Sequence, residues 1–242
     1  MIRRSRPQIP ATTRHLHDVA DMSFFDIFRD NYPPLVEQAS AQIQQMVETG
    51  RTMFAAATAY LLENEILNED LKQLDHTINE GEQKLRRAVL EHLMMRPERD
   101  LVFSLKLISI VHEAERIGDL SKSLAKMADL AHSPRLGPNV APLRAIRDHV
   151  FDIFNMIHEG FFKGNPEEAR NIMTAHDAIK QEAAQYIQHI ANEPSITPNE
   201  AVVYAMSARM LSRVSSHLAN IASTVVSPLD QMHRPPTAPE AP

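Results

Sequence analysis

The sequence contains no cysteine and no tryptophan, and only six of its 242 residues are glycine. The absence of cysteine excludes a disulfide framework, a thiolate nucleophile and any metal site built on sulfur. A metal ion would therefore have to be bound by carboxylates and imidazoles. Because 43% of the residues are hydrophobic and glycine is scarce, the core must consist of Leu, Ile, Val, Met and Ala, a composition that favours helices.

Long apolar runs are also missing. The longest, Met53 to Leu62, is rich in alanine and much shorter than the roughly 20 residues that a membrane span requires. Several arginines lie within residues 1–17, but no apolar segment of signal-peptide length follows them. We therefore expect a soluble cytoplasmic protein with no membrane span, which reaches a membrane only peripherally through its partners.

The formal net charge is −6, and residues 1–17 carry four arginines and no acidic residue. The rest of the chain is therefore still more acidic, which argues against a nucleic-acid partner. We interpret residues 1–30 as a basic, flexible arm. Residues 229–242 are rich in proline and are expected to form a disordered tail.

Apolar residues recur at helical spacing in three segments after the N-terminal arm. The spacing predicts helices from Pro34 to about Leu61, from Leu67 to about Arg96, and from about Arg99 to Leu130. The apolar positions of this pattern include Ile43, Met53, Ile78, Leu85, Val89, Leu101, Leu105, Ile117 and Leu124. Together these helices form a predicted first unit over residues 31–131.

Residues 132–142 contain three prolines and one glycine, and we interpret them as a linker. The helical pattern then resumes over Leu143 to about Phe162, from Asn165 onward, and from Thr197 to about Ser227. Asn165 precedes a proline and two glutamates, which favours a capped helix start, and Thr197 with Glu200 forms a capping-box pattern. Residues 143–228 are the predicted second three-helix unit.

The two units align with each other along the chain. At an offset of 101 residues Ile78 matches Ile179, and at an offset of 97 Arg116 matches Arg213. A tandem duplication explains both offsets, while chance similarity between amphipathic helices is the alternative. The predicted fold class is all-α, with two tandem three-helix bundles.

Acidic residues lie beside core positions in the first unit. The second predicted helix places Asp75 and Glu82 on one stripe, and the third places His112, Glu115 and Asp119 at i, i+3 and i+7. Burying a carboxylate is costly unless a cation accompanies it. Carboxylates on facing helices can bind a hard or borderline metal ion.

The alternative is that these acids lie at the edge of the bundle and pair with Arg86, Arg87 or Arg116. Enzyme signatures such as a nucleophile elbow, a phosphate-binding glycine loop and a dinucleotide fingerprint are absent. The Glu-x-x-His motif of ferritin-like di-iron proteins is absent as well. We therefore predict no enzymatic activity, with a metal-dependent hydrolase as the remaining enzymatic alternative.

The run VHEAERIGD at residues 111–119 resembles the signature of the PhoU family, whose core is E-R-I-G-D. Three other segments resemble the acidic motif of the family's second helix and its proline-containing turns, namely residues 74–79, 96–101 and 162–169. Asn79 stands where the family commonly has an acid. The resemblance covers about residues 30 to 228.

This resemblance implies a six-helix fold that binds metal clusters through E/D-x-x-x-D motifs and often forms homodimers. Glu115 and Asp119 match the metal motif directly. Asp75, Glu82 and His112 are the further expected ligands, and Arg116 is the expected neighbouring site residue. The implied metal is Mg, Mn, Fe or Zn, and a metal-free protein is the alternative.

The resemblance also implies a role in the phosphate regulon. Proteins of this family link the ATPase of a phosphate ABC transporter to a membrane sensor histidine kinase and dampen signalling when phosphate is plentiful. The alternative is a helical adaptor or transporter-associated domain that keeps the bundle without this role.

The second unit lacks the acids of the first. At the two offsets, Asp75, Glu82, Glu115 and Asp119 correspond to His176, Ala183, Ser212 and Ser216. We therefore expect a metal site in the first unit only.

Overall fold

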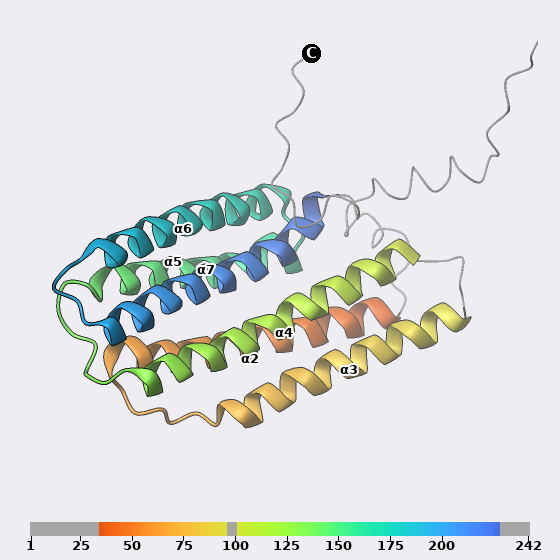
Figure 1. Ribbon diagram of the computed structural model, residues 1–242. Coiled ribbons are helices and arrows are strands. Elements are labelled where there is room, and N and C mark those ends of the chain that lie inside the picture. Colours follow the sequence, from red (N-terminus) through yellow and green to blue (C-terminus); the bar gives the residue numbers. More distant parts are fainter. Residues whose placement is uncertain (1–33, 96–100, 228–242) are drawn as a thin grey trace, which may run out of the picture.

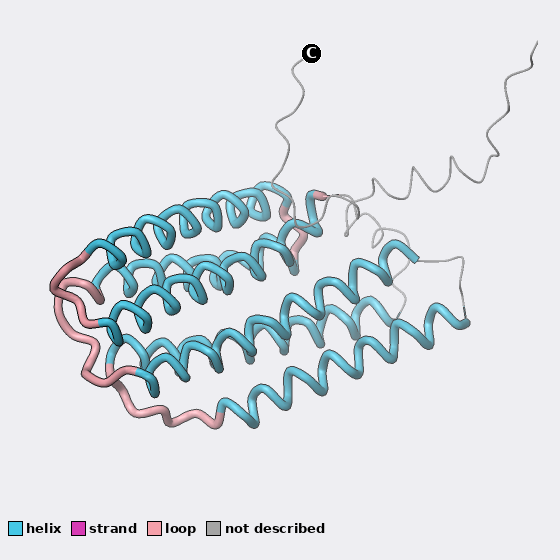
Figure 2. Tube along the Cα trace, viewed as in Figure 1, coloured by secondary structure: helices cyan, strands magenta, loops and turns pink. Residues whose placement is uncertain are grey.

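The computed structural model describes residues 34–95 and 101–227 (Figure 1). These residues form helices and no strand: α2 (Pro34–Thr58), α3 (Leu71–Met95), α4 (Leu101–Leu130), α5 (Ala141–Ile157), α6 (Pro166–Asn192) and α7 (Pro198–Val226) (Figure 2). The expected basic arm, the turn at residues 96–100 and the proline-rich tail lie outside the described residues.

Helices α4 and α7 lie antiparallel at the centre of the molecule (Figure 1). The side chain of Asn199, at the start of α7, donates to the carbonyl of Leu130 at the end of α4 over 3.0 Å. At the other end, Lys106 Nζ lies 3.4 Å from the carbonyl oxygen of Thr224. Helices α2 and α3 pack on α4, while α5 and α6 pack on α7. The prediction of two three-helix bundles is therefore confirmed.

The buried faces agree with the apolar spacing at most positions. Ile78 of α3 is buried against Gly118 of α4, Ile117 of α4 is buried against Gly50 of α2, and one hydrophobic core continues across both bundles. Two apolar positions of the pattern are not buried as predicted: Leu101 is 44% exposed and Leu105 is 42% exposed. Both lie on the side of α4 that no described helix covers.

Side-chain caps fix where three of the helices begin. Asn165 Oδ1 accepts hydrogen bonds from two backbone N–H groups of α6, and Thr197 and Glu200 form the predicted capping box. The predicted start of the second helix at Leu67 is wrong by one turn. Asp70 Oδ1 accepts the backbone N–H groups of residues 72 and 73 at 3.0 and 3.1 Å, so the helix begins at Leu71.

The first helix of each bundle ends in the same way. A π-helical turn follows α2 at η2 (Ala59–Glu63), and another follows α5 at η3 (His158–Phe162). After η2 the next residue, Asn64, is left-handed with φ of 58°, whereas after η3 Lys163 stays helical and the left-handed residue is Gly164, with φ of 66°. Because π-helical turns are uncommon, their recurrence at the end of the first helix of each bundle supports the tandem duplication.

The connection at residues 132–142 is bound tightly to the first bundle. Arg135 is buried, and its guanidinium donates to the carbonyls of Leu61 and Tyr60 at 2.7 Å each. These carbonyls belong to the C-terminal turn of the first helix, where intrahelical donors are missing. Arg135 therefore caps the helix of one bundle from the chain that leads to the next.

A buried polar cluster joins the two bundles. Glu113 of α4 accepts a hydrogen bond from Asn220 of α7 at 2.9 Å, and His217 Nδ1 lies 2.7 Å from the same carboxylate oxygen.

None of the helices in the described part of the chain is long and apolar enough to cross a membrane.

Candidate metal centre

The acids predicted from the sequence lie along the groove between α3 and α4. Close packing brings the two helices together, because a Cβ atom on Gly118 would come within 3.0 Å of the Ile78 side chain. The stripe that carries Ile78 also carries Asp75 and Glu82, so both carboxylates lie beside the core and near the acids of α4.

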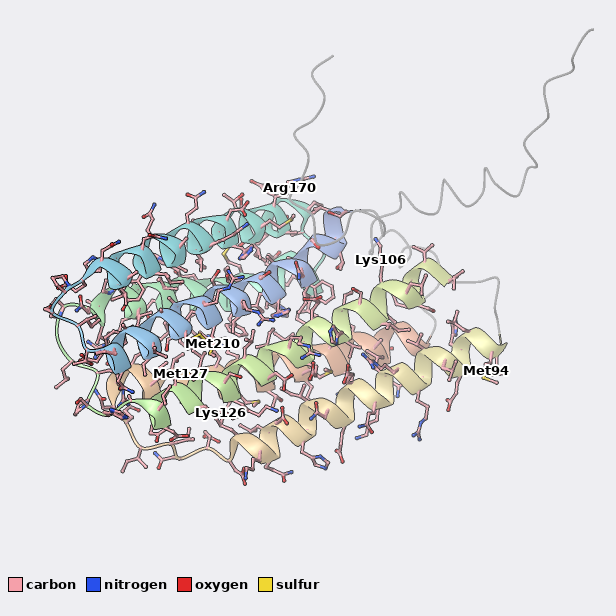
Figure 3. All side chains as sticks on the ribbon, in the orientation of Figure 1. Met94, Lys106, Lys126, Met127, Arg170 and Met210 are labelled. Atoms are coloured by element: carbon pink, nitrogen blue, oxygen red, sulfur yellow. The ribbon has the colours of Figure 1, made fainter. Side chains whose placement is uncertain are left out.

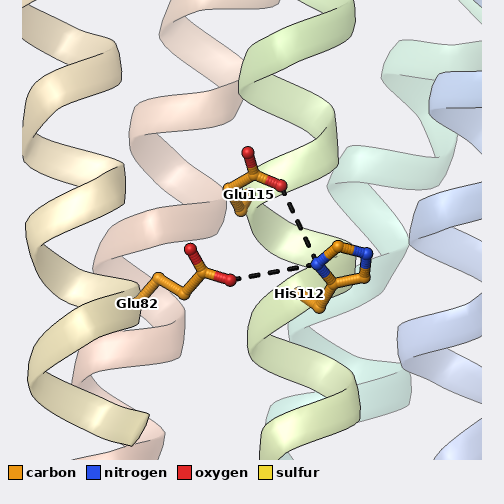
Figure 4. Close-up of side chains that lie close together, drawn as sticks. All are labelled: Glu82, His112 and Glu115. Atoms are coloured by element: carbon orange, nitrogen blue, oxygen red, sulfur yellow. Dashed lines mark ion pairs between the residues drawn. The ribbon is translucent and has the colours of Figure 1, made fainter.

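Glu82, His112 and Glu115 form the most compact group of potential ligands (Figure 4). One donor atom from each residue lies within 4.8 Å of the other two. His112 Nδ1 is 3.9 Å from both Glu82 Oε1 and Glu115 Oε2. The side chains of Glu82 and Glu115 are 16% and 14% exposed, while that of His112 is 43% exposed, so an ion could enter from solvent.

The environment of Glu115 disfavours its charged form. The pKa of Glu115 is raised to about 7, chiefly by burial and also by the neighbouring charge of Asp119, while Arg116 opposes the rise. Glu115 Oε2 is buried and accepts no hydrogen bond from the described residues. Arg116 Nε lies 3.4 Å from this oxygen. A metal ion would supply the partner that this oxygen lacks.

Asp75 and Asp119 are bound by a cation that belongs to the chain. Lys122 Nζ lies 2.7 Å from Asp75 Oδ1 and 3.0 Å from Asp119 Oδ1. Arg116 Nη1 is 3.1 Å from the other oxygen of Asp119, and Asn79 donates to Asp75 Oδ2 at 3.2 Å.

The pKa values of this second group follow from its ion pairs. Burial alone would raise the pKa of Asp119, but the hydrogen bond and the charge of Lys122 outweigh it and the pKa is lowered. Burial would likewise lower the pKa of Lys122, but the two aspartates raise it. Both partners are therefore held in their charged forms.

The structure thus separates the predicted ligands into two groups. Glu82, His112 and Glu115 come together as a possible metal site, whereas Asp75 and Asp119 converge on Lys122.

Of the three arginines predicted as alternative ion-pair partners of the acids, two form such pairs and one does not. Arg86 is 2.8 Å from Glu82 Oε1 and Arg116 bridges two of the acids, but Arg87 is exposed and pairs with no acid of the described site.

Sequence reasoning did not identify Lys122 as a site residue. It lies three residues after Asp119 and seven after Glu115, so its position on the acidic stripe was visible in the sequence. Its side-chain direction was not visible, because a lysine at this spacing can equally extend into solvent.

The second bundle has different chemistry at the equivalent positions. His176 Nδ1 lies 2.9 Å from Ser215 Oγ, and that hydroxyl donates to the carbonyl of Ser212 at 2.8 Å. Since the serine proton is already used, Ser215 accepts the Nδ1–H of His176. Burial lowers the pKa of His176, which favours the neutral ring. Ala183 is buried at the position equivalent to Glu82.

Comparisons with known proteins agree with this architecture. A family model described as the PhoU domain matches residues 43–128 and again residues 143–225. No curated protein matches the sequence.

Two solved structures are similar in fold. The crystal structure of PhoU from Pseudomonas aeruginosa superposes with a TM-score of 0.71 at 19% identity, covering 79% of this chain and 95% of that chain. The phosphate transport system regulatory protein PhoU from Streptococcus pneumoniae gives a TM-score of 0.66 at 18% identity with the same coverage, 79% and 95%.

Proposed function

The chain belongs to the PhoU family, and from that premise we propose that it regulates phosphate uptake and phosphate-regulon signalling through contacts with other proteins. The observation that carries the proposal is the match of the family's domain to both bundles, residues 43–128 and 143–225. The proposed partners are the ATPase of a phosphate ABC transporter and a sensor histidine kinase. The proposed location is the cytoplasm, and the proposed assembly is a homodimer.

A binding role without turnover fits the polar groups of the site. Asp75 and Asp119 are neutralised by Lys122 and Arg116, so neither is available as a general base. Glu82 is paired with Arg86. Of these ion pairs, the one between Lys122 and Asp75 joins α3 to α4, which is a structural task.

We further propose that the first bundle binds one metal ion through Glu82, His112 and Glu115. The ligands come from both α3 and α4, so the ion would hold the two helices together. Two carboxylates and an imidazole suit Mn, Fe or Zn better than Mg, which prefers oxygen ligands and water.

A second ion does not fit the aspartates of the same groove. Asp75 and Asp119 already share the ammonium group of Lys122, and a metal ion in the same place would be repelled by that charge. The site is therefore proposed for one ion and not for a multinuclear cluster.

Deletion of the gene tests the proposed function. Under phosphate-replete growth, deletion should raise alkaline phosphatase expression or phosphate uptake, because the proposed regulator dampens the response. The intact gene supplied in trans should reverse the change. If neither readout changes, the regulatory function is wrong and the helical adaptor becomes the better account.

Co-purification tests the proposed partners. The tagged chain should recover the transporter ATPase or the cytoplasmic region of the sensor kinase when they are expressed together. Recovery of neither protein would contradict the proposed contacts.

A further inference from the structure

An apolar surface covers the ends of α4 and α7 on the side that no described helix packs against. We call it the methionine patch, and it consists of Met127, Leu130, Val202, Met206 and Met210. Val202 is 52% exposed, Met206 45% and Leu130 42%, while Met127 and Met210 are half-buried against the core. The hydrogen bond from Asn199 to the carbonyl of Leu130 places the start of α7 beside the end of α4, and Figure 3 shows Met127 and Met210 where these helices run side by side.

The positions of these residues make the patch continuous. Val202, Met206 and Met210 follow one another at intervals of four residues, so they form a stripe along α7. Because α7 starts beside the end of α4 and runs antiparallel to it, the first part of the stripe lies beside the last turn of α4, which carries Met127 and Leu130. Exposed apolar surface of this kind marks interaction sites in soluble proteins. Methionine side chains are flexible and adapt to the shape of a partner.

Three cations border the patch. Lys126 projects from α4 (Figure 3). Arg209 and Arg213 are exposed on α7, three residues after Met206 and Met210 respectively, which places them on the same face of the helix. Within the described part of the chain, none of the three forms an ion pair or a hydrogen bond. This differs from the groove between α3 and α4, where Lys122 and Arg116 are bound to acids.

The acids closest in sequence to these cations have other partners. Glu200 belongs to the capping box with Thr197, and Asp129 accepts the hydroxyl of Tyr60 at 2.6 Å. The patch is therefore an apolar surface with an unneutralised basic edge on a chain whose formal net charge is −6.

We propose that this surface binds an acidic amphipathic helix of a partner protein. Apolar side chains of that helix would cover the methionine patch, and its carboxylates would pair with Lys126, Arg209 and Arg213. A helix of about three turns, roughly 16 Å long, matches the distance along α7 from Val202 to Arg213.

A second copy of this chain fits the surface less well. A two-fold contact centred on the patch would bring the same cations of both copies together, and like charges at an interface oppose association. The inference deepens the proposed function by naming a surface for protein contact, and it rests on that function for the identity of the partner. The binding chemistry itself can be tested without any phosphate readout.

The test uses the full-length chain and two fluorescent, helix-stapled peptides. Both peptides present leucines on one face, and they carry either glutamates or lysines along its edges. Fluorescence anisotropy should show binding of the glutamate peptide that weakens as salt is added, and little binding of the lysine peptide.

The charge-reversed variant R209E/R213E should lose at least about tenfold in affinity for the glutamate peptide and gain affinity for the lysine peptide. Met206→Ser should weaken the binding of either peptide to its matching protein. The control Arg87→Glu changes an exposed arginine on α3 that forms no ion pair with another described residue, and it should alter neither affinity. Circular dichroism should show that all variants remain folded.

Three results would overturn the proposal. The first is equal affinity of the wild-type chain for both peptides, and the second is unchanged selectivity in R209E/R213E. The third is concentration-dependent dimerisation in sedimentation experiments that Met206→Ser abolishes, since the patch would then be covered by a second copy. None of these results depends on the phosphate response, so failure here and failure of the regulatory function are distinguishable.

Discussion

Lys122 Nζ on α4 lies 2.7 Å from Asp75 Oδ1 on α3, so a positive charge supplied by the chain links the two helices. The same ammonium group is 3.0 Å from Asp119 Oδ1. Asp119 belongs to the motif that resembles the metal-binding motif of the family. In this chain, part of that motif is satisfied by lysine, and the residues that lie close enough together to hold an ion are Glu82, His112 and Glu115.

Removal of this internal cation should destabilise the protein in the absence of metal. Lys122→Met leaves Asp75, whose side chain is 15% exposed, without its ion pair, and we expect a loss of about 1–2 kcal/mol in the free energy of unfolding. Urea unfolding in chelator-treated buffer measures it. The control Lys126→Met changes an exposed, unpaired lysine and should stay within about 0.5 kcal/mol of wild type. Equal stability of Lys122→Met and wild type would show that Asp75 does not need the lysine.

The cap that Arg135 forms on the first helix should contribute more to the free energy of unfolding than the ion pair of Lys122 does. Arg135→Met removes the donors for the carbonyls of Leu61 and Tyr60 and leaves two partly buried acceptors unpaired. We expect a loss of about 2–4 kcal/mol in thermal or urea unfolding. Arg170→Met is the matched control, because Arg170 is exposed and bonds only within its own helix. A loss no greater than that of the control would mean that the connection is not held by Arg135.

Core positions of the first bundle should not accept a charge. Ile78→Asp and Ile117→Asp each place a carboxylate at a fully buried position and should cost about 4 kcal/mol or more. Ile66→Asp is the control, because Ile66 is 82% exposed and the change should be nearly neutral. Circular dichroism melts compare the three variants. Small effects at both buried positions would contradict the assigned packing of α3 and α2 on α4.

The sequence predicted the structure best where a local pattern, either apolar spacing or a capping residue, is enough to define a helix. The spacing of Ile78 and Leu85 identified both the helix and its buried face, and the capping residues Asn165 and Thr197 identified two helix starts. The π-helical turns were not predictable, because one extra residue in a turn leaves the apolar spacing almost unchanged. The ion pairs of Lys122 were not predictable either, since the register of α3 against α4 depends on tertiary contacts such as that at Gly118.

His176 should make the stability of the second bundle depend on pH. Burial lowers its pKa, with Lys180 and His217 contributing in the same direction and Asp177 opposing them. As the pH falls below about 6.5, the unfolded chain binds a proton before the folded chain does, so stability decreases with falling pH. His176→Asn should lose less stability than wild type between neutral pH and about pH 5 in urea unfolding. An identical pH dependence in both proteins would show that His176 titrates normally.

We propose that the two bundles share a fold but differ in chemistry, so that only the first binds metal and it binds a single ion. Chelator-treated protein dialysed against Mn²⁺ or Zn²⁺ should contain about one ion per chain by elemental analysis, a number set by three suitable ligands in one place. Glu82→Gln with Glu115→Gln should remove the ion, and Ser212→Ala with Ser216→Ala should retain it. Two or more ions per chain, no ion at all, or an ion retained after the loss of Glu82 and Glu115 would contradict the account.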